Sequence, residues 1–176
     1  ATDKEAIVHD ALNDAGESVD SPLLPAMLGI PANKTAYAFD AAKAGKQLDD
    51  AGWKIAEGAT IRSRIFKART TSEKDQQVPL AIELTTSSLP EIVAVAQQLK
   101  AQWEPLGIQV TLRTLSVSEI QQSFKDRDYQ ALLFGQVLGL DPDPFSFWHS
   151  SHKRDPGRNL ALYDNKDADK LLEEAR

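Results

Sequence analysis

The chain has 176 residues, of which 41% are hydrophobic and 26% are charged, and this composition is typical of one globular domain with a sizeable core. Its formal net charge of -6 offers no basic face for a phosphate backbone, so we expect no nucleic-acid partner. It contains no cysteine, which excludes disulfides, zinc–thiolate clusters and a cysteine nucleophile.

The first half of the chain is predicted to form two helices and a hairpin. Thr2 and Glu5 have the spacing of a capping box, which predicts a helix starting at the first residues. A segment punctuated by proline and glycine follows, and Asp40 is then predicted to cap the second helix. Two loosely alternating segments, 60–68 and 78–84, are separated by a polar turn and therefore predict a β-hairpin.

The second half alternates helices and strands. A capping box at 88–91 opens a regular amphipathic helix, and residues 108–112 then alternate as a strand. A further capping box at 116–119 opens a short helix, and 129–137 return as a mostly apolar strand. Such strand–helix–strand units connect parallel strands. We therefore predict an α/β fold with a small, mainly parallel sheet, to which the hairpin adds an antiparallel edge.

The end of the chain predicts one more helix. Asn165 is predicted to cap it, and it continues to Arg176 without a glycine, a proline or another stop signal. We therefore expect residues 1–176 to be a single domain cut from a longer protein.

The sheet suggests where a ligand would bind, because ligands of open α/β sheets lie outside the carboxyl ends of the parallel strands. Loops leave those ends at 85–88, at 114–116 and from Gln136 onward. Of these residues, we select Thr86, Ser87 and Gln136 as candidate ligand contacts.

The longest of these loops contains the stretch GLDPDPFSFWHSSH. Asp143 precedes a proline and is predicted to cap a short helical turn, whereas Asp141 has no such local role and is the better candidate for a ligand contact. Phe145, Phe147 and Trp148 cannot all point into one core from a single short turn. We predict that Phe145 and Trp148 line a binding cleft, where aromatic faces supply contact area to an organic ligand.

Two alternatives use the same loop differently. His149 and His152, together with Asp141 or Asp143, have a spacing compatible with a carboxylate–histidine metal site, and hence with a small metal-dependent hydrolase. No HExxH motif, third nearby histidine or GxSxG motif supports a metal centre or a nucleophile, so we predict no catalytic residues and no cofactor. A structural domain without a ligand would instead bury all three aromatic side chains.

Several long segments carry a family resemblance. They resemble, in the same order and spacing, consecutive segments of the family 5 extracellular solute-binding proteins, the oligopeptide and dipeptide receptors of ABC importers. The segments are YAFDAAKAGKQLDDAGW (37–53), LKAQWEPLGIQVTLRTL (99–115), DRDYQALLFGQVLGLDPDPFSFWHSS (126–151) and NLALYDNKDADKLLEEAR (159–176). The opening ATDKEAIVHDAL resembles the helix that precedes the same lobe.

This resemblance implies a fold, partners and a location. Members consist of two lobes that close on a ligand, with a fold like that of the type II periplasmic binding proteins, and this chain would be most of the C-terminal lobe. The implied partners are a peptide or similar small solute, the missing N-terminal lobe and the permease subunits of an ABC importer. The implied location is outside the cytoplasmic membrane, either in the periplasm or as a cell-surface lipoprotein, and the implied role is binding without catalysis.

One departure from the family pattern concerns the cargo. Peptide receptors of the family commonly hold the ligand's free amine with an acid a few residues upstream of the Asp-Pro pair that Asp141-Pro142 resembles. Residues 137–140 of this chain read VLGL and contain no acid. Asp141 is a candidate substitute, and a sugar or a metal chelate is the alternative cargo.

Overall fold

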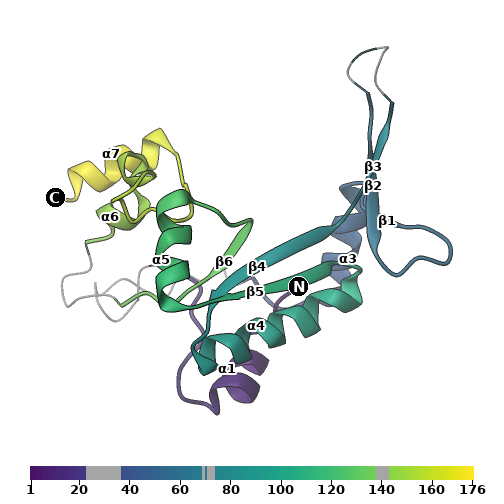
Figure 1. The fold of residues 1–176 in the computed structure, drawn as a ribbon, viewed down its shortest axis with the longest axis horizontal. Coiled ribbons are helices and arrows are strands. Elements are labelled where there is room, and N and C mark those ends of the chain that lie inside the picture. The colour runs from purple at the N-terminus through teal and green to yellow at the C-terminus, as the bar shows by residue number, and fades with distance from the viewer. Residues whose placement is uncertain (23–36, 69, 71–73, 138–142) are drawn as a thin grey trace. The chain divides into compact units, whose positions relative to one another are not determined.

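The computed structural model describes residues 1–22, 37–68, 70, 74–137 and 143–176, and Figure 1 traces the chain. The contacts form two compact units. Unit 1 comprises Ala1–Ser18, Tyr37–Thr114 and Gln130–Leu133, and unit 2 comprises Val19–Ala36, Leu115–Tyr129 and Phe134–Arg176. In the described ranges, no helix has the length and apolar character needed to cross a bilayer.

A three-stranded sheet organises unit 1. Its strands are β4 (Ala81–Ser87), β5 (Gln109–Leu115) and β6 (Ala131–Leu133), in the order β5-β4-β6. β4 and β6 are parallel, and Thr85 lies opposite Leu132. The helix α4 (Pro90–Trp103) and a 3-10 turn, η1 (Glu104–Leu106), connect β4 to β5, and α5 (Val117–Asp126) connects β5 to β6. The predicted α/β class with two strand–helix–strand units is confirmed, although the last strand is shorter than the predicted 129–137.

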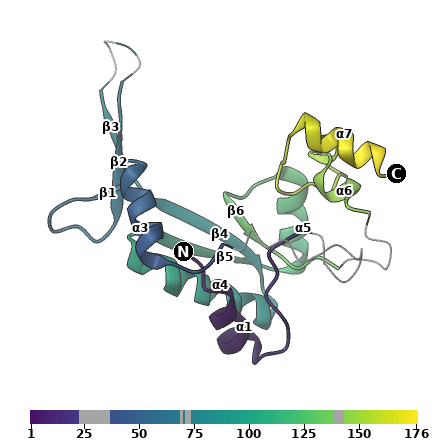
Figure 2. The same ribbon diagram turned by 180° about the vertical axis from the view of Figure 1, so that it is seen from behind.

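The core of unit 1 lies between this sheet and α4. Leu84, Ala96, Ile108 and Val110 are its buried members, and leucines of the neighbouring elements pack around them. The first helix, α1 (Lys4–Leu12), packs against α4, and the two lie side by side in Figure 2. The Trp103 indole N–H donates to the Thr2 hydroxyl at 3.0 Å, which fixes the end of α4 to the start of the chain.

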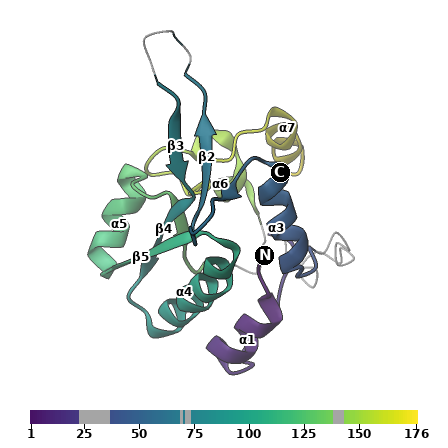
Figure 3. The same cartoon turned by 90° about the vertical axis from the view of Figure 1, so that its right-hand side faces the viewer.

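The hairpin forms a sheet of its own. β1 (Lys54–Ile55), β2 (Arg62–Phe66) and β3 (Gln76–Pro79) are antiparallel in the order β1-β2-β3. Helix α3 (Ala41–Asp50) precedes it, and Figure 3 shows β2 and β3 extending as one ribbon away from the parallel sheet. The hairpin is therefore not an edge of the parallel sheet, as the sequence had led us to expect.

Leu80 explains this difference. The predicted strand 78–84 is divided at Leu80 into β3 and β4. The Leu80 N–H donates to the Arg62 carbonyl at 2.7 Å, and the Leu80 carbonyl accepts from the Gln109 N–H at 2.9 Å. One residue therefore bonds to the antiparallel sheet through its amide and to the parallel sheet through its carbonyl.

Unit 2 contains short helices tied together by polar side chains. They are α5, α6 (Phe145–Trp148), the 3-10 turn η2 (Ser150–His152) and α7 (Lys166–Glu174). Arg127 ends α5 and donates to the carbonyls of Phe124, Lys153 and Gly157. The Tyr129 hydroxyl donates to the Leu160 carbonyl at 2.7 Å, and burial raises the pKa of this phenol. These contacts hold the segment between α6 and α7 against the end of α5.

The helix caps test the sequence patterns individually. Asp40 and Asn165 cap α3 and α7 as predicted, and the capping box that begins at Ser116 has both of its reciprocal hydrogen bonds. The other two predicted boxes are wrong. Asp3, not Thr2, caps α1, and α4 begins after Leu89, which makes no side-chain cap bond, with Pro90 in its first turn.

Candidate ligand-binding site

The carboxyl end of β4 buries three hydroxyl side chains. The exposed fractions of Thr85, Thr86 and Ser87 are 0%, 0% and 3%. The Thr86 hydroxyl donates to the Leu133 carbonyl at 3.0 Å and so helps to pair β4 with β6. The hydroxyls of Thr85 and Ser87 have no hydrogen-bond partner within the described part of the chain. Such a buried group costs about 1–3 kcal/mol, which a water or a polar ligand group that reached it would offset.

Gln136 lies in the loop that follows β6. It lies beyond the last strand residue, Leu133, and its side chain is exposed. Asp141 lies outside the described residues, as do 138–140 of the VLGL segment.

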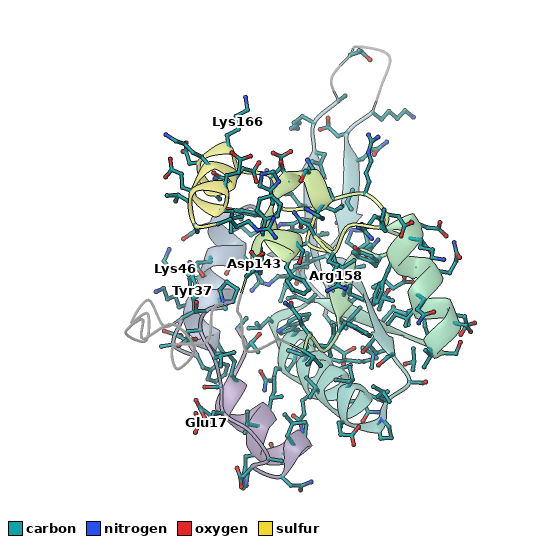
Figure 4. The ribbon with its side chains drawn as sticks, turned by 90° about the vertical axis from the view of Figure 1, so that its left-hand side faces the viewer. Glu17, Tyr37, Lys46, Asp143, Arg158 and Lys166 are labelled. Atoms are coloured by element: carbon teal, nitrogen blue, oxygen red, sulfur yellow. The ribbon has the colours of Figure 1, made fainter. Side chains whose placement is uncertain are left out.

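Asp143 organises the start of α6 and is labelled in Figure 4. Its carboxylate accepts from the Phe145 backbone N–H at 2.9 Å and from the Arg176 guanidinium at 2.6 Å and 2.9 Å. The Phe145 amide, assisted by Arg176, holds the pKa of Asp143 below its ordinary value. The predicted capping position is wrong by one residue, because Pro144 is the N-cap of α6 and makes no side-chain cap bond, although Asp143 accepts from the first N–H of the helix.

The Phe145 ring is contacted closely by other side chains of the chain. The His149 ring lies 4.3 Å from its centre at an interplanar angle of 15°, and the Arg176 guanidinium carbon lies 4.2 Å from that centre. The His152 ring also meets the Phe145 ring, with the ring centres 5.5 Å apart and an interplanar angle of 82°. Three side chains of the chain itself therefore already contact Phe145.

Trp148 has a different environment. Its side chain is half-buried, and its ring meets the Tyr163 ring edge to face at 5.9 Å. Its backbone carbonyl accepts from the Asn159 side chain at 3.3 Å. The backbone of Trp148 is therefore fixed by Asn159. Tyr163, which contacts the Trp148 ring, is 39% exposed.

His149 is held by protein groups of the loop and of α7. His149 is 8% exposed, and its Nδ1 accepts from the Ser151 backbone N–H at 3.1 Å. Its Nε2 lies 3.3 Å from Glu173 Oε1, which links η2 to α7. Ser150 donates through its hydroxyl and its N–H to Asp169, and these bonds lower the pKa of that carboxyl. Among the described residues, no group of three or more acidic, histidine or cysteine side chains could hold a metal ion.

The candidate residues fall into two groups. Thr86 and Ser87 are adjacent on β4 in unit 1, whereas Phe145 and Trp148 share α6 in unit 2. Sequence reasoning missed Asn159 and Tyr163, which support and adjoin Trp148. The sequence pattern that could have indicated them is an amide and an aromatic residue four positions apart, shortly before the predicted cap of α7.

These features define a class of protein. A short parallel sheet with helical crossovers and a separate hairpin sheet make up the part of the type II periplasmic binding protein fold that the chain matches in the solved structures. Residues 1–158 match the profile of the bacterial extracellular solute-binding proteins, family 5 (Middle). The chain belongs to that family.

Individual relatives agree with this assignment. The chain is 28% identical over 180 residues to the oligopeptide-binding protein AppA of Bacillus subtilis, matching 100% of this chain and 31% of that protein. It is 25% identical to the heme-binding protein A of Haemophilus influenzae over 99% of this chain and 29% of that protein.

Solved structures of similar proteins also match almost the whole chain. AppA in complex with a nonapeptide matches with a TM-score of 0.83 and 25% identity, over 99% of this chain and 33% of that one. NikZ of Campylobacter jejuni in complex with Ni(L-His) matches with a TM-score of 0.78 and 26% identity, over 99% of this chain and 33% of that one. The chain thus spans about a third of the length of these relatives.

Proposed function

We propose that this chain is most of the C-terminal lobe of a substrate-binding component of an ABC importer. The full-length protein would capture a peptide or a similar small solute outside the cytoplasmic membrane and deliver it to the permease subunits. The match of residues 1–158 to the family 5 profile carries this proposal. Anchoring as a lipoprotein and a purely binding, non-catalytic role are parts of the same proposal.

We further propose that the ligand contacts are Thr86, Ser87, Gln136, Asp141, Phe145 and Trp148. The hydroxyl of Ser87 has no partner among the described residues, and the amide of Gln136 is exposed. Both groups support this set, because each can donate to and accept from a peptide group. The half-buried ring of Trp148 supplies apolar contact area. The second wall of the site would come from the missing N-terminal lobe.

The cargo is inferred from the named relatives and from residues 137–140. The named relatives bind an oligopeptide, heme or a nickel–histidine complex. A peptide is our first choice, because an oligopeptide-binding protein is similar to the chain both in sequence and in structure. The absence of an acid from residues 137–140 favours a ligand that does not present a free amine at this position.

Native mass spectrometry tests the proposal. The full-length protein is purified from its own host without denaturation, and the 176-residue chain is the control. We expect co-purified peptides on the full-length protein and none on the chain, because one wall of a two-walled site supplies too few contacts to offset the entropy of association. A sugar or a metal chelate would replace the peptide proposal, and a full-length protein that carries no solute and binds none on addition would contradict a receptor role.

A further inference from the structure

The segment between α6 and α7 is built around one buried amide. Asn159 is 0% exposed, and its side-chain nitrogen donates to the carbonyls of Trp148, His149 and Tyr163 at 3.3, 3.2 and 2.8 Å. Its side-chain oxygen accepts from the Tyr163 backbone N–H at 3.0 Å. Asn159 therefore binds both backbone groups of Tyr163 and one of Trp148, so it fixes these two aromatic residues relative to each other.

The aromatic residues of unit 2 differ in what remains available to a ligand. The His149 ring stacks on Phe145, the Arg176 guanidinium lies over the Phe145 ring, and Arg158 lies over Phe147. The hydroxyl of Tyr129 is bonded to a backbone carbonyl. Tyr163, in contrast, is 39% exposed, and its hydroxyl has no partner among the residues that the structure describes.

We propose that Tyr163 is a further ligand-contacting residue, and that it forms with Trp148 an aromatic corner, held by Asn159, that selects solutes with an aromatic side chain. The inference rests on the proposed function. Rigid aromatic rings that meet edge to face leave an angle into which a third ring can pack, and the phenol hydroxyl can donate to a carbonyl of the same ligand. Asn159 acts as a positioning residue.

Two peptides and two variants of the full-length protein test the proposal. Isothermal titration calorimetry measures the affinities for Ala-Phe-Ala and Ala-Ala-Ala of the wild type, Tyr163→Ala and Leu162→Ala. Leu162 is the matched control, because it is the adjacent residue and is 46% exposed. Fluorine NMR of protein labelled with 5-fluorotryptophan follows the Trp148 resonance, which Trp148→Phe assigns.

We expect Tyr163→Ala to weaken Ala-Phe-Ala binding by about three- to tenfold, the range for one aromatic pair, and to change Ala-Ala-Ala binding by less than about twofold. Leu162→Ala should leave both affinities unchanged, and Ala-Phe-Ala should shift the Trp148 resonance. Peptide binding that is insensitive to Tyr163, or equally reduced for both peptides, would overturn the inference and leave the proposed function intact. A wild type that binds neither peptide would overturn the inference together with the peptide part of the proposed function.

Discussion

Arg62 donates from Nη1 to Asp49 Oδ1 at 2.7 Å, although its side chain is only 8% exposed and that of Asp49 is 43% exposed. The same guanidinium donates to the carbonyls of Leu106 and Trp53 at 2.6 and 2.8 Å. One buried cation thus joins α3, β2 and the end of η1. Its charge is compensated by a carboxylate that remains in contact with water.

Replacement of Arg62 should destabilise unit 1 strongly. Arg62→Met keeps much of the apolar stem but deprives two carbonyls and a carboxylate of a charged donor, so we expect the free energy of unfolding to fall by about 2–4 kcal/mol. Urea denaturation followed by circular dichroism measures it. Arg64→Met is the control: Arg64 is exposed and lies over the Phe66 ring, so it should cost less than about 1 kcal/mol. Equal losses for the two variants would contradict the role of Arg62.

Asp49 should make stability depend on pH. The hydrogen bond from Arg62 is the main reason why the pKa of Asp49 lies below its ordinary value in the folded chain. A lowered folded-state pKa stabilises the fold above the unfolded-state pKa, and this contribution disappears as the pH falls through the folded-state value. We expect Asp49→Asn to remove part of the loss in urea midpoint between neutral and acidic pH. An unchanged pH profile in this variant would show that other carboxyl groups dominate.

Gly107 should not tolerate a side chain. Its φ is 81°, and an added Cβ would lie 2.8 Å from Arg62 Cγ and 3.3 Å from Ile55 Cδ1. Gly58 is the matched control, because its φ is 75° and nothing lies within 4 Å of an added Cβ. Both alanine substitutions should incur the left-handed backbone cost of about 1–2 kcal/mol, and Gly107→Ala should add a further steric loss. Thermal unfolding compares them, and equal melting temperatures would rule out the clash.

Loss of the Asn159 amide should affect the whole segment between α6 and α7. Asn159→Asp is close to isosteric, but it replaces a group that donates to three carbonyls with a buried carboxylate. We expect a destabilisation of about 3–5 kcal/mol, measured by urea unfolding. Gln136→Ala, an exposed change in the same unit, should stay within about 0.5 kcal/mol. A small effect of Asn159→Asp would mean that the segment is held by Arg127 and Tyr129 instead.

Local patterns predicted much of the fold because their determinants are local. Ser116 and Glu119 cap α5 reciprocally, and this contact needs only a spacing of three residues. The break at Leu80 was not predictable in this way, since its two hydrogen bonds come from Arg62 and Gln109, which are distant in sequence. The mostly apolar sequence of residues 78–84 is compatible with one strand and with two.

The candidate site was less predictable because its contacts also join residues that are distant in sequence. The aromatic residues of the GLDPDPFSFWHSSH loop stood out by composition, but composition does not indicate which ring faces are occupied. Arg176 covers Phe145 from a position 31 residues later, and Asn159 supports Trp148 from 11 residues later. Such partners become evident only when the chain is folded.

The position of Leu80 has a mechanical consequence. Its amide belongs to the hairpin sheet, its carbonyl belongs to the parallel sheet, and β4 continues from it without interruption to Thr86 and Ser87. A β-strand is nearly inextensible along its axis. The base of the hairpin and the polar end of β4 are thus the two ends of one continuous extended segment, so a displacement of the hairpin along β4 would act on Ser87 through the backbone of this segment.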